Sequence, residues 1–105
     1  MWLAHLSPTI GREKAGTRPC LVLSNNTFNR GPAELVVIVP LTTRERRVWS
    51  HVQIDPPHGG LRAISFAMCE NIRALSTDRF TDYWGSVDPR TMNIVEDRLR
   101  VLLDL

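Results

Sequence analysis

The last part of the chain holds the one segment that is long and regular enough to form a substantial helix. Asp88 is a good N-cap residue and Pro89 suits a first helical position, so we expect a helix from Pro89 to about Leu103. Its apolar residues recur at helical spacing and form a wide stripe: Met92, Val95, Leu99, Leu102 and Leu103, widened by Ile94 and Val101. A stripe of this width predicts packing against a sheet and leaves room for contact with a second subunit.

Glycine and proline divide the sequence before this helix into apolar segments of strand length. We expect strands at residues 2–6, 20–23, 34–41, 48–54 and 63–69, a short helical turn at 73–80, and a last strand at 84–87. Pro40 should lie at an edge or a bulge because proline cannot donate to a ladder. Alternation within 48–54 puts His51 on the solvent-facing side. Together the elements predict one mainly β (α+β) domain over residues 1–105, a small twisted SH3-like β-barrel with a C-terminal α-helix.

Composition narrows the class of protein. The 105 residues suit a single domain, and no apolar run approaches the ~20 residues that span a bilayer. The first residues lack a basic start and a long apolar core, so we expect no export signal, no membrane partner and a cytoplasmic location. Cys20 and Cys69 each lie within an apolar segment and are expected to be small buried hydrophobes. Their spacing does not support a zinc site.

A glycine-bracketed, highly charged loop at residues 11–19 leads directly into the strand expected at 20–23. Arg18 stands where the loop meets the strand, so a rigid element aims its guanidinium group. Two basic side chains and one acid, followed by a fixed arginine, suit the binding of a phosphodiester. On residue types alone, a plain surface ion pair between Arg18 and Glu13 is the competing interpretation.

The loop also carries the pattern G-x-E-x-x-G-x-R-P, and on this pattern the chain resembles the MazF/PemK family of toxin endoribonucleases. The resemblance extends over essentially the full chain. Further matching segments are Ser7-Pro8-Thr9, Ser24 with Phe28-Asn29, Pro40-Leu41-Thr42-Thr43, Glu70-Asn71-Ile72-Arg73-Ala74-Leu75, Arg79-Phe80 and Gly85-Ser86-Val87.

The resemblance implies the CcdB/MazF-like fold and the toxin role in a type II toxin–antitoxin module. It implies metal-independent, cofactor-free and sequence-selective cleavage of single-stranded RNA, including mRNA. The products would be a 2′,3′-cyclic phosphate and a 5′-hydroxyl. It also implies a homodimer that is silenced by a MazE-like antitoxin with an acidic C-terminal segment.

Carried over by position, Arg18 and Thr42 take the catalytic places with Glu13 close by. Arg18 would stabilise the phosphorane, Thr42 would donate a hydrogen bond to the phosphate, and Glu13 would act as base or orient Arg18. The general acid is left unassigned. The residues expected to bind RNA are Arg12, Lys14, Thr43, Arg44, Glu70 and Asn71. Arg12 and Lys14 stand where Ser and Gln are frequent in the family, and Glu70-Asn71 replaces the usual Asp-Gln.

Two other functions stay open at the level of sequence. One is a CcdB-like poison of DNA gyrase, and the other is a non-catalytic interaction module that holds a partner's carboxylates. The threonines 42 and 43 would then be ordinary strand-ending residues, and the arginines at 44, 46 and 47 a solvated charge run. The three histidines lie in separate segments without partner spacing and do not suggest a histidine-based nuclease. Cleavage of RNA in the presence of EDTA would distinguish the endoribonuclease from these two alternatives.

Overall fold

The computed structural model describes residues 1–6 and 16–105. Their strands and longer helices are β1 (Trp2–His5), β2 (Thr17–Val22), α1 (Asn26–Asn29), β3 (Leu35–Thr42), β4 (His51–Ile54), β5 (Ser65–Met68), β6 (Arg73–Ser76), β7 (Phe80–Tyr83) and α2 (Pro89–Leu103). Three single 3₁₀ turns are interspersed: η1 (His58–Gly60), η2 (Cys69–Asn71) and η3 (Thr77–Arg79).

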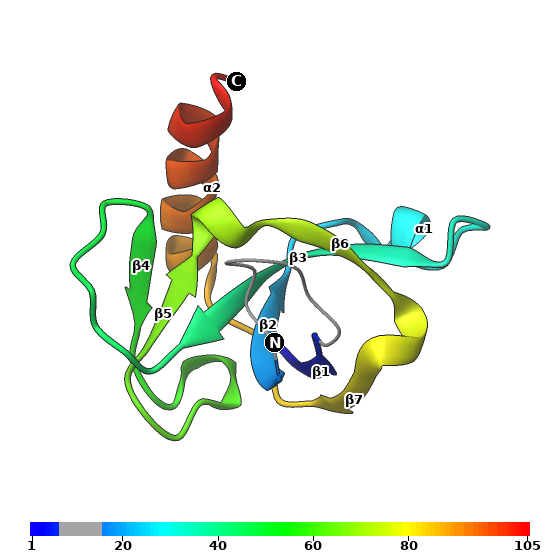
Figure 1. Ribbon diagram of the computed structural model, residues 1–105, viewed down its shortest axis with the longest axis horizontal. Helices are drawn as coiled ribbons and strands as arrows, with labels where there is room; N and C mark the ends of the chain where they lie inside the picture. Colours follow the sequence, from blue (N-terminus) through cyan, green and yellow to red (C-terminus); the bar gives the residue numbers. More distant parts are fainter. Residues whose placement is uncertain (7–15) are drawn as a thin grey trace.

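The seven strands form one antiparallel sheet in the order β4-β5-β3-β2-β1-β7, with β6 also paired to β3 (Figure 1). β3 is therefore the central strand. It pairs with β2 at residues 38–40, with β6 at 35–38 and with β5 at 41–42. The sheet curls strongly, so that β6, β7, β1, β2 and β3 surround one small interior while β4 and β5 extend to the other side (Figure 1). This arrangement agrees with the predicted twisted barrel.

Two hydrophobic cores lie on opposite faces of the curled sheet. One fills the small interior with Ala4, Leu6, Cys20, Val36, Ile38 and Leu75. The other packs the outer face of β2–β5 against α2 through residues that include Leu21, Val39, Leu41, Ile54, Val95 and Leu99. Because adjacent strand residues point to opposite faces, β2 supplies Cys20 to one core and Leu21 to the other. The uninterrupted apolar run at residues 20–23 predicts a strand buried on both faces, and the two cores confirm it.

The helix is predicted correctly at both ends. α2 spans Pro89–Leu103, and the Asp88 side chain accepts a hydrogen bond from the backbone N–H of Thr91. It packs on the sheet as far as Leu99, whereas its last turn projects beyond the sheet edge (Figure 1). Several apolar side chains on the projecting part are exposed, namely Val101 at 68%, Leu102, Leu103 and Leu105.

Two expectations along the chain are wrong. Residues 73–80 do not form a helical turn. They form β6, the single turn η3 and the first residue of β7. The expected strand at 84–87 is absent, and the last strand is β7 at 80–83, which pairs with β1. These strands are four residues long and owe their conformation to distant partners, so local sequence alone carries little signal for them.

Pro40 lies neither on an edge strand nor in a bulge, contrary to expectation. It is buried in β3, opposite Cys20 of β2. On the other side of β3, pairing with β6 ends at Ile38 and pairing with β5 begins at Leu41. Proline is therefore accommodated where the partner strand changes, so the missing N–H does not interrupt either ladder.

Candidate active site

A cavity of about 370 Å³ opens where β2, β3 and β5 meet. The residues that line it are Thr17, Arg18, Pro19, Leu41, Thr42, Thr43 and Ser65. Cys20 pairs with Pro40, so the antiparallel register brings Arg18 of β2 beside Thr42 of β3. Two of the three side chains that the family resemblance assigned to catalysis therefore share one cavity, and strands rather than loops carry both.

Arg18 supplies the positive charge of this cavity. It is half-buried, and its Nη1 donates to the backbone oxygen of Leu41 at 3.3 Å. This bond fixes the direction of the guanidinium group, which carries five N–H donors in a rigid fork. A planar, permanently charged fork beside a polar cavity is suited to the non-bridging oxygens of a phosphate.

Thr42 supplies a hydroxyl group whose donor direction is set by its neighbours. The backbone N–H of Arg44 donates to Thr42 Oγ1 at 3.2 Å. Because that bond occupies an oxygen lone pair, the hydroxyl hydrogen is left to point at another acceptor. Arg18 and Thr42 can thus donate toward the same anionic group from two strands.

The remaining predicted residues divide into three groups. Glu13, Arg12 and Lys14 lie outside the described residues. Thr43 lines the cavity beside Thr42. Arg44 follows immediately and is exposed, and its backbone N–H donates to Thr42 Oγ1. Glu70 and Asn71 do not line the cavity and lie in η2, beyond the far end of β5.

The Glu70 carboxylate is occupied by neighbouring donors. Ser50 Oγ donates to Oε1 at 2.6 Å, while His51 Nε2 and Asn71 Nδ2 lie 2.7 and 3.3 Å from Oε2. Burial alone would raise the pKa of the Glu70 carboxyl, but the hydrogen bonds from Ser50, the backbone and His51 outweigh burial, and the pKa lies below its usual value. The carboxylate is therefore ionised near neutral pH.

His51 is not solvent-facing as predicted: only 4% of its side chain is exposed, and its Nε2 lies 2.7 Å from Glu70 Oε2. Ser65 was not among the predicted site residues. It enters the cavity because β5 pairs with the end of β3, and its hydroxyl donates to the oxygen of Ala63 at 3.0 Å. The only sequence signal for this is the run of small residues at alternate positions of 63–69, which lets another strand approach closely.

Neither cysteine is a nucleophile. Burial raises the pKa of the Cys20 thiol to about 12, an effect that the charges of Arg18 and Arg73 oppose only in part. Burial likewise raises the pKa of Cys69 to about 11. Both side chains are buried, as the sequence predicted, and both thiols stay protonated at neutral pH.

Another cavity, of about 490 Å³, lies on the small barrel between the aromatic residues Trp2, Phe80 and Tyr83. Its other lining residues are Met1, Val22, Asn26, Asn29, Val36 and Thr77, so no charged side chain faces it. Of these two cavities, only the one at Arg18 offers a cation to a phosphate. None of the described helices is long and apolar enough to cross a membrane.

Comparison with known proteins gives consistent results. A family model described as "PemK-like, MazF-like toxin of type II toxin-antitoxin system" matches residues 1–103. Endoribonuclease EndoA of Bacillus subtilis is 32% identical over 106 residues, covering 100% of this chain and 91% of that protein. Endoribonuclease MazF1 of Mycobacterium bovis is 37% identical over 90 residues, covering 86% of this chain and 82% of that protein.

Solved structures agree with this assignment. A mycobacterial endoribonuclease in complex with its cognate antitoxin has a TM-score of 0.80 at 32% identity, covering 99% of this chain and 90% of that one. MazF from Deinococcus radiodurans has a TM-score of 0.84 at 26% identity, covering 99% and 94%. With a family model spanning nearly the whole sequence, relatives above 30% identity and the same fold, the chain belongs to the PemK/MazF family of type II toxins.

Proposed function

We propose that this chain is a sequence-selective endoribonuclease that cleaves single-stranded RNA without a metal ion, as the toxin of a type II module. The observation that carries the proposal is the shared cavity of Arg18 and Thr42, on adjacent strands of the central sheet. Family membership supports the activity, since relatives at 32% and 37% identity are named endoribonucleases.

The proposed chemistry is transesterification. The 2′-hydroxyl attacks the adjacent phosphorus, the bond to the 5′-oxygen breaks, and the products are a 2′,3′-cyclic phosphate and a 5′-hydroxyl. Arg18 stabilises the charge that builds on the non-bridging oxygens, and the Thr42 hydroxyl donates to the same group. Glu13 is proposed to accept the 2′-hydroxyl proton or to orient Arg18. An arginine pKa above ~12 makes Arg18 a poor proton donor to the 5′-oxygen, so another group supplies that proton.

Two protein partners belong to the proposal. The first is a cognate antitoxin, whose acidic segment would lie along Arg18 and the basic residues Arg12 and Lys14 and exclude RNA. A related mycobacterial endoribonuclease has been solved in complex with its cognate antitoxin. The second is another copy of this chain. The projecting last turn of α2 exposes Val101, Leu102 and Leu103, an apolar surface that a homodimer would cover. The site of action would be the cytoplasm.

One assay tests the activity. The protein is incubated with a long single-stranded transcript in EDTA, and the new ends are mapped and analysed for cyclic phosphate. Cutting at a short recurring motif is the expected result. Absence of cutting would contradict the proposal and favour a gyrase-binding or non-catalytic role, whereas cutting that EDTA abolishes would contradict the metal-free mechanism.

A further inference from the structure

A hydrogen-bonded cluster of Ser50, His51, Glu70 and Asn71 lies at the end of β5 opposite the catalytic cavity. Ser65 at the start of β5 lines that cavity, and η2 begins directly after Met68. Cys69 lies four positions beyond Ser65, and four steps along an extended strand span about 13 Å. The cluster is thus too far away to act on the scissile bond held by Arg18 and Thr42.

The cluster nevertheless shares the face of the sheet that carries Thr42. Thr42 lies opposite Phe66, and His51 lies opposite Met68. Residues 66 and 68 of a strand point to the same side, so their cross-strand partners do as well. Phe66 and Met68 are themselves buried, so an RNA strand that extends from the cavity would pass over the residues that cover them to reach the half-buried Asn71.

Glu70 is the centre of the cluster, but little of its carboxylate is available to a ligand. A carboxylate has about four lone-pair positions, and Ser50, His51 and Asn71 occupy three of those on Glu70. The backbone of the two segments is also joined, since the Cys69 N–H donates to the Ser50 oxygen at 3.1 Å. Glu70 therefore acts as an anchor between β4 and η2, not as a free reader of bases.

His51 is committed to this anchor. Because an ionised carboxylate can only accept, Nε2 of His51 must carry the hydrogen of the 2.7 Å contact. The other ring nitrogen, Nδ1, is buried and has no hydrogen-bond partner among the described residues. A buried ring nitrogen without a hydrogen-bond partner lowers stability. The hydrogen bond from Nε2 to Glu70 is the observed interaction that holds the His51 ring in this position.

Asn71 is the member of the cluster with unused hydrogen-bonding groups. One N–H of its carboxamide is held by Glu70 at 3.3 Å, which fixes the plane of the amide. Among the described residues the oxygen and the second N–H have no hydrogen-bond partner and form an adjacent acceptor and donor. Such a pair matches the edge of an unpaired base, and amide side chains commonly read bases in this way.

We propose that His51 is a positioning residue for base recognition: by holding Glu70 it presents the Asn71 carboxamide to an unpaired base that flanks the scissile linkage. The inference rests on the proposed endoribonuclease function. It assigns base contact to Asn71, a supporting role to Glu70, and a role in specificity to His51.

The test measures discrimination, not activity alone. The cleavage motif of the wild-type protein is first mapped on a transcript pool. Short RNAs that differ from the motif at one base are then cleaved in competition with the parent RNA in the same tube. The ratio of the two rates does not depend on the folded fraction, so loss of stability in a variant cannot change it.

Asn71→Ala should lower discrimination about tenfold at one motif position. His51→Leu should lower it at the same position and leave the other positions unchanged. His51→Gln retains an amide donor toward Glu70 and should recover discrimination. Asn93→Ala is the matched control, because it removes the same kind of side chain from an exposed position on α2, which packs on the other face of the sheet. It should equal the wild type.

Wild-type discrimination at every position in His51→Leu would overturn the inference, as would losses at different positions in His51→Leu and Asn71→Ala. Both results presuppose a wild-type protein that cuts RNA, so they leave the proposed function standing. A wild-type protein that cuts no RNA would overturn the proposed function and this inference together.

Discussion

Replacing Arg18 with alanine should abolish most cleavage while leaving the fold intact. The side chain is half-buried, and its bond to the Leu41 oxygen is long at 3.3 Å. Such a bond contributes about 1 kcal/mol to the free energy of unfolding, a small part of the total for a domain of this size. By contrast, removing one preorganised donor to a developing anionic charge typically lowers kcat by about 10²–10³, or roughly 2.7–4 kcal/mol.

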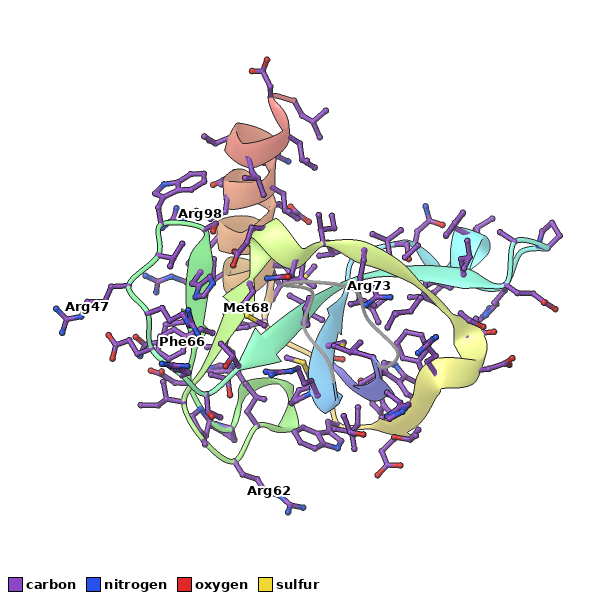
Figure 2. The ribbon with its side chains drawn as sticks, in the orientation of Figure 1. Arg47, Arg62, Phe66, Met68, Arg73 and Arg98 are labelled. Carbon is purple, nitrogen blue, oxygen red and sulfur yellow. The ribbon has the colours of Figure 1, made fainter. Side chains whose placement is uncertain are left out.

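Two exposed arginines provide controls for the loss of one positive charge. Arg47 and Arg62 extend away from the body of the protein (Figure 2), and both residues are exposed. Arg47→Ala and Arg62→Ala should cleave within about threefold of the wild type. Arg18→Lys keeps the charge but loses the planar fork, so its rate should fall between those of the wild type and Arg18→Ala.

The assay is single-turnover cleavage of an end-labelled RNA with protein in excess, together with urea unfolding of each variant. Under these conditions the observed rate is that of cleavage within the bound complex, and product release does not affect it. If Arg18→Ala is folded and cleaves within threefold of the wild type, the guanidinium group has no part in stabilising the phosphorane.

Three other substitutions have expected outcomes. Thr42→Val keeps the shape but removes the hydroxyl donor, so single-turnover cleavage should fall about 10- to 100-fold, whereas Thr42→Ser should stay near the wild type. Gly60→Ala should lower the free energy of unfolding by at least about 3 kcal/mol, because a Cβ there would lie 2.1 Å from a backbone oxygen; Gly16→Ala, with similar positive φ but open space, should cost only about 1 kcal/mol. Urea titration of both glycine variants checks the difference, and equal losses would refute the steric argument. Hydrogen bonds from Thr91 lower the pKa of Asp88. Its capping contribution is therefore complete above the ordinary aspartate pKa and is lost as the pH falls through the lowered value. Asp88→Ala should lower the urea midpoint at pH 7, and the gap should narrow in strong acid; a gap independent of pH would contradict it.

The sequence predicts the fold best where local signals agree with tertiary contacts. α2 has an N-cap, an N1 proline and an amphipathic stripe that all specify the same helix, and it was predicted to the residue. β6 and β7 were missed because each is four residues long and is defined by pairing with β3 or β1. Pairing over such separations leaves no period in the local sequence.

The candidate site was predicted in part. Arg18 and Thr42 were identified through the family pattern, and the register of β2 and β3 brings them together. Composition could not reveal that His51 contacts the Glu70 carboxylate in η2, since the two residues are 19 positions apart in the chain. Nor could it reveal that Glu70 is already occupied, because residue type does not say which lone pairs are used.

The central position of β3 has a consequence for how RNA is held. This strand borders both cores and ends in Thr42, while Arg18 stands on the neighbouring strand, so these two walls of the candidate cavity are already paired with each other before a ligand arrives. If RNA docks there as proposed, β2 and β3 require little further ordering, and the RNA loses the larger share of conformational entropy relative to these two strands. Stiffening the substrate, rather than the enzyme, is the change that would tighten this complex.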